Sequence, residues 1–251
     1  MLLAAGRGER MRPLTDSTPK PLLQVQGRAL LDWHMAALQR EGVRDVVVNT
    51  AWLGAQIPAH LDAQWPQQGM QLQYSHEQAD FGHALETAGG IARALPMLGK
   101  AFWLAAGDVF APDFVFDAAA AQAFAQSNDL AHVWLVPNPA HNLKGDFGLV
   151  EATHGSGTGR AANLPPADVA RDLRPRFTYS TIALLKADLF RMPWCDIAAG
   201  NPQGEAAPLA PLLRRAMDAG RCGATLYTGR WTDVGTPERL AALNADAPVN
   251  G

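Results

Sequence analysis

The chain has 251 residues, of which 48% are hydrophobic and 18% are charged, and its formal net charge at pH 7 is −3. This length is sufficient for one large α/β domain with a real hydrophobic core, so we expect residues 1–251 to form a single domain. The small negative net charge excludes a positive electrostatic field around the whole protein that would attract nucleic acid. No apolar run approaches the length of a membrane span. Cys195 and Cys222 are expected to be reduced thiols. We therefore expect a cytoplasmic protein that binds neither nucleic acid nor membranes.

The first informative stretch, Leu2–Lys20, combines a short apolar run, a glycine-rich turn and a basic loop. Glycine permits close approach of a ligand, and exposed N–H groups in a loop after a buried strand bind anions. Four cations, Arg7, Arg10, Arg12 and Lys20, add charge that would hold a polyphosphate. Composition alone leaves an ordinary strand-to-loop connection with solvated arginines equally open.

Helices and strands alternate in the next part of the chain. The residue patterns predict a helix over Leu30–Glu41, a buried strand over Asp45–Asn49, a helix over Leu53–Gln64 and a strand over Met70–Ser75. Elements alternating at this spacing predict an α/β fold with a Rossmann-like, mixed but mostly parallel sheet flanked by helices.

The second informative stretch is Glu77–Ile91, which contains the string Leu85-Glu86-Thr87-Ala88-Gly89-Gly90. This string predicts the start of a helix with Thr87 as its N-cap. The glycines beyond the cap would let a flat ring or a phosphate approach the helix N-terminus. The alternative is a glycine-rich helix start that binds no ligand.

Two aspartates stand next to the ends of predicted elements, and the first of them, Asp108, is at a place that suits a metal ion. Asp108 follows the apolar strand predicted over Phe102–Ala106, and open α/β sheets bind ligands beyond the carboxyl ends of parallel strands. Its hard oxygens suit Mg²⁺ shared with triphosphate oxygens. Asp233 lies just before Thr236, a predicted N-cap, and Pro237, the predicted first residue of a helix. Taken alone, a Gly-Asp pair such as Gly107-Asp108 is usually a simple turn, and a single aspartate in a loop such as Asp233 usually has no function of its own.

The middle of the chain contributes structural elements. We expect a helix over Asp113–Gln126 and a strand over Leu130–Val136. The polar stretch Glu151–Asp172, with several glycines and two prolines, predicts a hairpin or mobile insertion without a function of its own.

The order of residues in these motifs resembles the signature of the sugar-1-phosphate nucleotidyltransferases. The string L-A-A-G-x-G-x-R-M-x-P-L-T, followed by Pro19-Lys20-Pro21-Leu22, is a long gapless match, and Trp231–Thr236 matches the motif W-x-D-V-G-T. The resemblance spans Leu2–Leu243, and relatives usually begin two or three residues before the position of Met1. It implies a nucleotide-binding half at about residues 1–110 and a sugar-binding half at about 111–251.

The resemblance also implies roles for particular residues of the nucleotide-binding half. The loop would wrap the nucleoside triphosphate, Arg10 and Lys20 would neutralise phosphates, and Asp108 and Asp233 would hold Mg²⁺. The loop residues concerned are Ala4, Ala5, Gly6, Arg7 and Gly8.

One branch of the family is indicated by the string L-E-T-x-G-G-I at Leu85–Ile91. It resembles the base-recognition segment of uridylyltransferases that act on N-acetylmuramate 1-phosphate in peptidoglycan recycling. Glu77 and the backbone at Glu86 and Thr87 would then face the pyrimidine of UTP. The substrates would be UTP and a sugar 1-phosphate, handled by a monomer or small homo-oligomer.

The sugar site resembles the family in two further segments. Gly145–Val150 matches the strand that lines the sugar pocket, and Phe177–Ile182 resembles the segment F-x-x-S-G-I. The residues that would contact the sugar 1-phosphate are Phe147, Gly148, Ser180, Thr181 and, on the following helix, Arg214.

Three positions depart from the family pattern. Thr181 replaces a glycine, and because β-branched residues disfavour positive φ, either the backbone must differ there or the sugar must lie differently. Pro208 replaces a frequent lysine, and Ala106 replaces an asparagine that is common in the recycling branch.

Two alternatives to a uridylyltransferase remain open at this stage. One is the same chemistry on another pair of substrates, as in a guanylyl- or thymidylyltransferase that acts on a hexose or heptose 1-phosphate. The other is a non-catalytic nucleotide-sugar sensor that kept the fold. The presence of Arg10, Lys20, Asp108 and Asp233 argues against the sensor, because a protein without catalysis has no physical need for both carboxylates.

Overall fold

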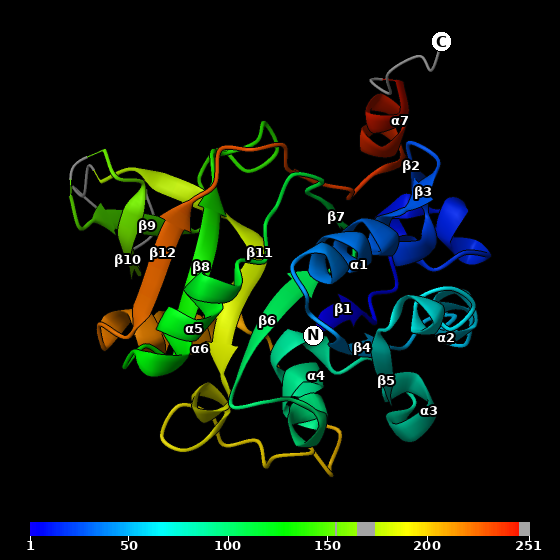
Figure 1. The fold of residues 1–251 in the computed structure, drawn as a ribbon, viewed down its shortest axis with the longest axis horizontal. Helices are drawn as coiled ribbons and strands as arrows, with labels where there is room; N and C mark the ends of the chain where they lie inside the picture. Colours follow the sequence, from blue (N-terminus) through cyan, green and yellow to red (C-terminus); the bar gives the residue numbers. More distant parts are fainter. Residues whose placement is uncertain (154, 165–173, 246–251) are drawn as a thin grey trace. The chain divides into compact units, whose positions relative to one another are not determined.

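The structure is a computed structural model that describes residues 1–153, 155–164 and 174–245 (Figure 1). The chain divides into two compact units. Unit 1 comprises Met1–Glu86, Ala105–Phe116 and the segment from Arg230 onwards, and unit 2 comprises Thr87–Leu104 and Asp117–Gly229. The segment from Arg230 therefore belongs with the N-terminal part of the chain. The single domain expected from the sequence, with its nucleotide-binding and sugar-binding roles, stays a prediction.

Unit 1 is built on parallel strands. The short strand β1 (Leu2–Ala4) pairs in parallel with β4 (Asp45–Thr50) and with the last residues of β6 (Ala101–Ala106), and β4 pairs in parallel with β5 (Gln71–His76). The run of valines in β4 is buried, as expected for a strand inside a parallel sheet. Helix α1 (Leu30–Arg40) buries its apolar residues at helical spacing.

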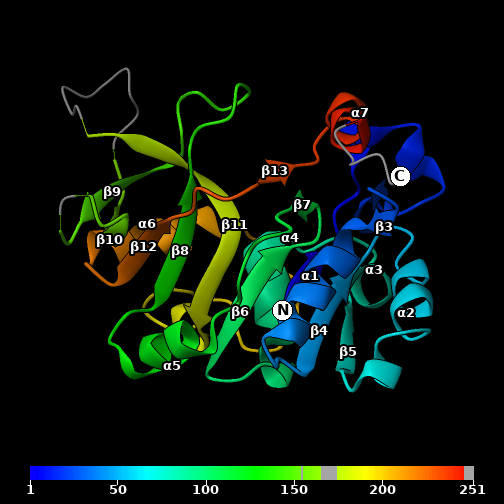
Figure 2. The same ribbon diagram turned by 45° about the horizontal axis from the view of Figure 1, so that its top comes forward.

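Shorter elements complete unit 1. They are η1 (Glu9–Met11), η2 (Leu14–Asp16), η3 (Lys20–Leu22), β2 (Gln24–Val25), β3 (Arg28–Ala29), α2 (Gln56–Leu61), η4 (Pro66–Gln68), α3 (Glu77–Phe81), β7 (Val109–Phe110), β13 (Thr232–Asp233) and α7 (Pro237–Ala245). Strand β13 pairs with β7 in antiparallel fashion, and Asp233 lies opposite Val109 (Figure 2). This two-stranded ladder connects the C-terminal segment to the chain that follows β6.

Unit 2 is largely antiparallel. Its elements are α4 (Glu86–Ala94, from Thr87), η5 (Leu95–Met97), β6, α5 (Ala118–Gln126), β8 (Ala131–Val136), β9 (Phe147–Glu151), β10 (Thr158–Ala162), β11 (Arg176–Lys186), η6 (Ala187–Phe190), α6 (Ala210–Asp218) and β12 (Cys222–Leu226). Strand β11 runs antiparallel to β8 and β9, β10 runs antiparallel to β9 and β12, and β12 runs parallel to β8. Helix α6 packs on β10 and β12.

The predicted α/β fold with a mixed sheet is confirmed. In the described part of the chain, nine strands are hydrogen-bonded in the order β5-β4-β1-β6-β11-β8-β12-β10-β9. The parallel ladders β5-β4-β1-β6 belong to the segment where strands and helices alternate, and antiparallel ladders dominate beyond β11. Antiparallel strand pairs therefore make up a larger part of the sheet than the sequence pattern predicted. The polar stretch 151–172 does form a hairpin between β9 and β10, and positions 154 and 165–172 of it lie outside the described residues.

Three predicted helix starts were wrong. The helix predicted from Leu53 begins at Gln56, and Leu53, with a φ of +50°, has a left-handed conformation in the segment before it. The helix predicted from Asp113 begins at Ala118, where the Asp117 side chain accepts the Ala119 N–H at 2.7 Å and caps the helix. Thr87 is not an N-cap, because α4 begins one residue earlier, at Glu86.

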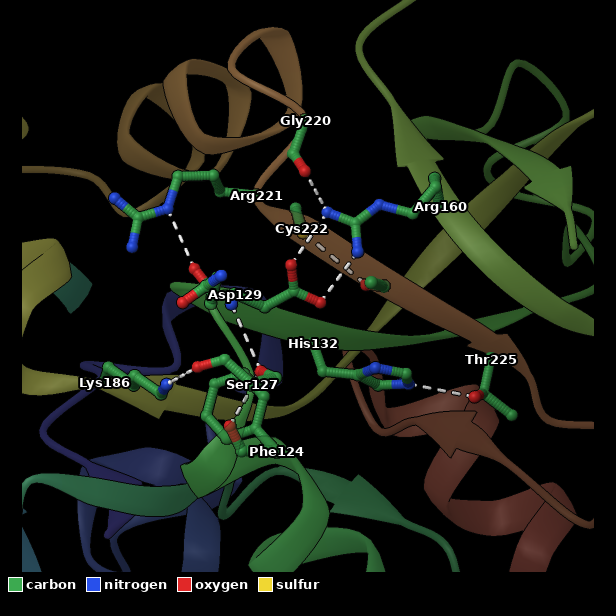
Figure 3. A network of polar contacts seen from close by, with 12 residues as sticks. Phe124, Ser127, Asp129, His132, Arg160, Lys186, Gly220, Arg221, Cys222 and Thr225 are labelled. Atoms are coloured by element: carbon green, nitrogen blue, oxygen red, sulfur yellow. Dashed lines mark hydrogen bonds and ion pairs between the residues drawn. The ribbon is translucent and has the colours of Figure 1, made fainter.

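A polar network in unit 2 ties β8, β10 and β12 together (Figure 3). Asp129 accepts two hydrogen bonds from the Arg160 guanidinium, at 2.7 and 2.8 Å, and Arg160 also donates to the Gly220 carbonyl. His132 Nε2 lies 2.9 Å from Thr225 Oγ1 across the β8–β12 ladder. Burial lowers the pKa of His132 to about 4, with Asp129 opposing and Arg160 assisting the shift. The ring is therefore neutral inside the folded protein.

This histidine predicts acid-dependent stability. The unfolded chain binds a proton at His132 near pH 6.5, whereas the folded protein does so only near pH 4, so the free energy of unfolding falls as pH falls through this window. His34, also buried with a pKa lowered to about 4, contributes in the same direction. His132→Leu should reduce the loss of stability between about pH 7 and 4.5 by roughly 1–3 kcal/mol. Urea denaturation at both pH values measures the difference, and equal losses in wild type and variant would contradict the prediction.

Candidate active site

The glycine loop after β1 is a closed structure within unit 1. Gly8 has a φ of +66°, and the Thr15 hydroxyl donates to its carbonyl at 2.8 Å. A Cβ on Gly8 would lie 3.0 Å from Thr15 Cγ2 and 3.2 Å from Lys20 Cβ. Glycine is therefore required by both the backbone conformation and the lack of space. It brings the start of the loop against the segment that carries Lys20.

The four cations of the loop differ in what they contact. Arg7 donates to the Thr15 carbonyl at 3.0 Å and lies over the Trp52 ring, and Arg12 pairs with Asp16 at 2.7 Å. These two arginines hold the loop together. The side chain of Arg10 is exposed and makes no hydrogen bond or ion pair with any residue that the structure describes. Arg10 is therefore available to an anionic ligand.

The two predicted metal-binding aspartates meet at the β7–β13 ladder. Asp108 comes immediately before β7 and Asp233 is the last residue of β13. The Val234 N–H donates to the Asp108 carbonyl at 2.9 Å, which fixes the two backbones side by side. Lys20 Nζ lies 2.6 Å from Asp108 Oδ2, and Arg239 Nη1 lies 2.5 Å from Asp233 Oδ2. The structure thus brings together Lys20, Asp108 and Asp233, and it adds Arg239, which the sequence analysis missed.

An apolar cluster supports these charged groups. Its members are Met11, Leu23, Val25, Leu30, Phe110, Val234 and Leu240, with Trp33 and Leu243 packed against them. Three of these buried residues directly follow charged ones in sequence, since Met11 follows Arg10, Val234 follows Asp233 and Leu240 follows Arg239. The cluster therefore anchors the backbone beside each charge.

Glu77 belongs to a buried polar network. Its side chain is fully buried and accepts hydrogen bonds from Asn49 Nδ2 and from the Leu85 N–H, both at 2.7 Å. Asn49 Oδ1 accepts the Ala4 N–H at 2.9 Å. Burial raises the pKa of Glu77, and the two hydrogen bonds offset this only in part. The network connects the end of β1 to the segment before Glu86. The sequence analysis missed Asn49, although a polar residue after three buried valines was its signal.

The segment that opens α4 is strained at its first residue. Glu86 is exposed and has a φ of +56°, a conformation that costs a non-glycine residue about 1–3 kcal/mol. Thr87 is partly buried. The N–H groups of Ala88 and Gly89 both donate to the Ala207 carbonyl, at 2.8 and 3.2 Å. These two N–H groups are therefore already paired inside unit 2.

The five predicted sugar-contacting residues all lie in unit 2. Phe147 is buried, Gly148 is paired with both β10 and β11, and the exposed Arg214 guanidinium lies 5.5 Å from the Phe147 ring centre. The Ser180 hydroxyl is fully buried, donates to the Trp134 carbonyl at 2.7 Å and accepts the Ile182 N–H at 3.1 Å. Ser180 thus shapes the backbone of a bulge in the β11–β8 ladder.

Thr181 does not change the backbone as the sequence led us to expect. It has a φ of +62°, so the chain keeps the conformation that suits the family's glycine and accepts the strain of a β-branched residue. Its hydroxyl donates to the Ser180 carbonyl at 2.6 Å. Of the two expectations, a different backbone is therefore wrong, and a different position of the sugar stays a prediction.

The carboxylate pair has the chemistry of a magnesium site. Mg²⁺ is held in proteins by one or two carboxylates together with phosphate oxygens and water, and Asp108 and Asp233 supply two such groups on adjacent strands. Among the residues that the structure describes, no group of three or more His, Cys, Asp or Glu side chains could hold a metal. The donor set therefore fits a metal that arrives with a phosphate ligand and does not fit a closed structural site.

The nucleotidyl transferase family model matches residues 1–248. The chain belongs to this family. It is 41% identical to the N-acetylmuramate alpha-1-phosphate uridylyltransferase of Neisseria meningitidis serogroup B, over 98% of this chain and 96% of that protein. It is 31% identical to the enzyme of the same name from Caulobacter vibrioides, over 98% of this chain and 95% of that protein.

The fold is shared with solved structures of the nucleotidyl transferase family. A putative glucose-1-phosphate thymidylyltransferase from Bacillus anthracis, solved with a sucrose, superposes with a TM-score of 0.76 at 17% identity. The match covers 100% of this chain and 95% of that one. Within the described residues, no helix combines the length and apolar character that a membrane crossing requires.

The buried network around Asn49 predicts a loss of stability on substitution. Asn49→Ala leaves the Ala4 N–H and one Glu77 oxygen without their partner inside the protein, which should lower the free energy of unfolding by about 2–4 kcal/mol. Asn244→Ala is a matched control, because Asn244 also makes two hydrogen bonds, with the main chain at Gln26 and Gln24, but at the exposed surface. Urea denaturation should give a loss below about 1 kcal/mol for the control. Equal losses in the two variants would contradict a buried network.

Proposed function

We propose that this chain transfers the uridylyl group of UTP to N-acetylmuramate α-1-phosphate, giving the UDP-sugar and pyrophosphate. The observation that carries the proposal is the pair of aspartates on the β7–β13 ladder, each beside a cation, in a chain of the nucleotidyl transferase family. The two uridylyltransferase relatives, aligned over almost their whole length, support the choice of substrates. The cytoplasmic location and the monomer or small homo-oligomer expected from the sequence stay predictions.

The proposed reaction is an in-line displacement at phosphorus. An oxygen of the sugar 1-phosphate attacks the α-phosphorus of UTP, the bond to the bridging oxygen of pyrophosphate breaks, and pyrophosphate leaves. The attacking phosphate is already ionised at pH 7, so no general base is required. Positioning and charge neutralisation account for the catalysis in reactions of this type.

The residues divide these tasks between them. Asp108 and Asp233 would hold Mg²⁺, which when bound neutralises charge on the triphosphate. Arg10, exposed and without a partner among the described residues, covers the β- and γ-phosphates. Lys20 stabilises charge at the reacting α-phosphate, and Ala4, Ala5, Gly6, Arg7 and Gly8 form the loop around the triphosphate. The Lys20–Asp108 contact at 2.6 Å supports placing the lysine beside the metal-bound phosphate.

The base and sugar contacts are proposed from the branch resemblance. The backbone at exposed Glu86 and partly buried Thr87 would face the uracil, and buried Glu77 holds this segment through the Leu85 N–H. On the sugar side, Phe147, Gly148, Ser180 and Thr181 form the wall, with Ser180 acting through the backbone that it supports. The exposed Arg214 guanidinium is the group that would pair with the lactyl carboxylate of N-acetylmuramate.

The substrates are tested by a matrix of nucleoside triphosphates against sugar 1-phosphates, read by pyrophosphate release. A buried polar group left unpaired by the wrong base costs about 1–3 kcal/mol, so UTP should exceed GTP in kcat/KM by roughly ten- to a hundredfold. The kcat/KM for N-acetylmuramate 1-phosphate should exceed the values for N-acetylglucosamine, glucose and mannose 1-phosphates. A preference for a sugar without the lactyl group would overturn the substrate assignment and leave the nucleotidyl transfer standing. A preference for GTP or dTTP would favour the other branches of the family.

The metal assignment is tested by Asp108→Asn and Asp233→Asn. Each change keeps the shape of the side chain and removes the negative charge that a hard cation needs, so kcat should fall at least about a hundredfold. Circular dichroism should show an intact fold, because neither carboxylate is part of the apolar cluster. Asp113→Asn is the matched control, since Asp113 forms an exposed ion pair with Arg230 in the same unit. Turnover near wild type in either active-site variant at saturating Mg²⁺ would reject the assignment.

A further inference from the structure

Arg239 makes an ion pair with one of the two proposed metal ligands. Its Nη1 atom donates to Asp233 Oδ2 at 2.5 Å and to the Asp233 carbonyl at 3.1 Å. The two side chains are only 21% and 27% exposed, so the pair is partly shielded from water. One nitrogen of the guanidinium thus holds both the carboxylate and the main chain of the same residue.

The position of Arg239 is unfavourable for the helix that carries it. Arg239 is the third residue of α7, and the first turn of a helix favours acidic side chains because its N–H groups carry partial positive charge. A cation there contributes nothing to the stability of α7. The contact with Asp233, which lies outside the helix, is the interaction that accounts for a charged residue at this place.

Gly235 provides the space for this contact. A Cβ on Gly235 would lie 2.9 Å from Arg239 Nη1, 3.1 Å from Asp233 Oδ2 and 3.5 Å from Arg10 Nη2. Any larger residue would therefore force the guanidinium to shift. The same measurement shows that the guanidinium groups of Arg10 and Arg239 both lie beside Gly235, so an anion bound by Arg10 is within reach of Arg239.

We propose that Arg239 is a positioning residue that occupies Asp233 until the nucleotide binds, and so makes divalent metal binding depend on the nucleotide. The inference rests on the proposed function, in which Asp233 holds the metal. A guanidinium in contact with Oδ2 repels a divalent cation at the same oxygen. A triphosphate held by Arg10 offers the guanidinium a new partner and releases the carboxylate. Metal and nucleotide then strengthen each other's binding by the same factor.

The test uses Mn²⁺ as the probe, with protein-bound Mn²⁺ obtained by electron paramagnetic resonance as the difference between samples with and without protein at the same UTP concentration, and no sugar phosphate present. Wild type, Arg239→Gln, Arg239→Lys and Arg230→Gln are titrated without nucleotide and with saturating UTP. Without nucleotide, Arg239→Gln should bind Mn²⁺ about tenfold tighter than wild type, because the competing charge is gone. The gain in Mn²⁺ affinity on adding UTP should shrink by a similar factor. Arg239→Lys should stay within about threefold of wild type, since a single ammonium can replace the single nitrogen that makes the contacts.

Arg230→Gln is the matched control, because it removes an arginine from an exposed pair with Asp113 in the same unit. It should leave Mn²⁺ binding unchanged. Unchanged or weaker binding of Mn²⁺ by Arg239→Gln without nucleotide would overturn the proposal, as would an equal gain in Arg230→Gln. If Arg239→Gln loses helicity, Gly235→Ala must give the same tightening by displacing the guanidinium, and its failure to do so also overturns the proposal. Absence of Mn²⁺ binding by wild type with UTP would instead reject the metal site on which both proposals depend.

Discussion

The apolar cluster of unit 1 is the feature on which the candidate active site depends. Both ion pairs are partly buried, and the desolvation of their charges offsets much of their attraction, so Lys20–Asp108 and Arg239–Asp233 cannot by themselves hold four chain segments in place. A fully buried large apolar side chain contributes about 1.5–3 kcal/mol, and the cluster has seven buried members, five of them at most 2% exposed. Their burial fixes the backbone, and the charged residues next to them in sequence are positioned as a consequence.

Charge compensation explains why two carboxylates can lie side by side on the β7–β13 ladder. Each aspartate has its own cation, so the pair does not suffer the full repulsion of two adjacent negative charges. Arg10 stays without such a partner among the described residues. The result is a site that is electrostatically balanced before substrates arrive and that still has a free cation for a phosphate. A triphosphate that arrives with a divalent cation brings a negative group for the cations of the site and a positive group for its aspartates, so both can exchange partners.

The sequence predicted the parts of this site that follow from chain order. Asp108 was expected beyond the carboxyl end of a parallel strand, and the resemblance to the family added Lys20 and Asp233 to the same site. Arg239 was missed because its role depends on side-chain contacts that no periodicity encodes, and the polar residue Asn49 after three buried valines gave a signal but not its partners. The start of α2 was missed because the φ of Leu53 is set by tertiary context. Thr181 shows the same limit, because a β-branched residue disfavours the positive φ that the bulge imposes on it.

The central claim is that Asp108 and Asp233 bind one metal ion together with the nucleotide. The most direct test is the Mn²⁺ affinity, with UTP saturating, of wild type, Asp108→Asn, Asp233→Asn and the double variant. Ligands of one ion act as a unit, so each single change should abolish most of the binding and the second should add little. Two losses that simply add, or a single variant with unchanged affinity, would show that the aspartates do not share a metal and would contradict this account.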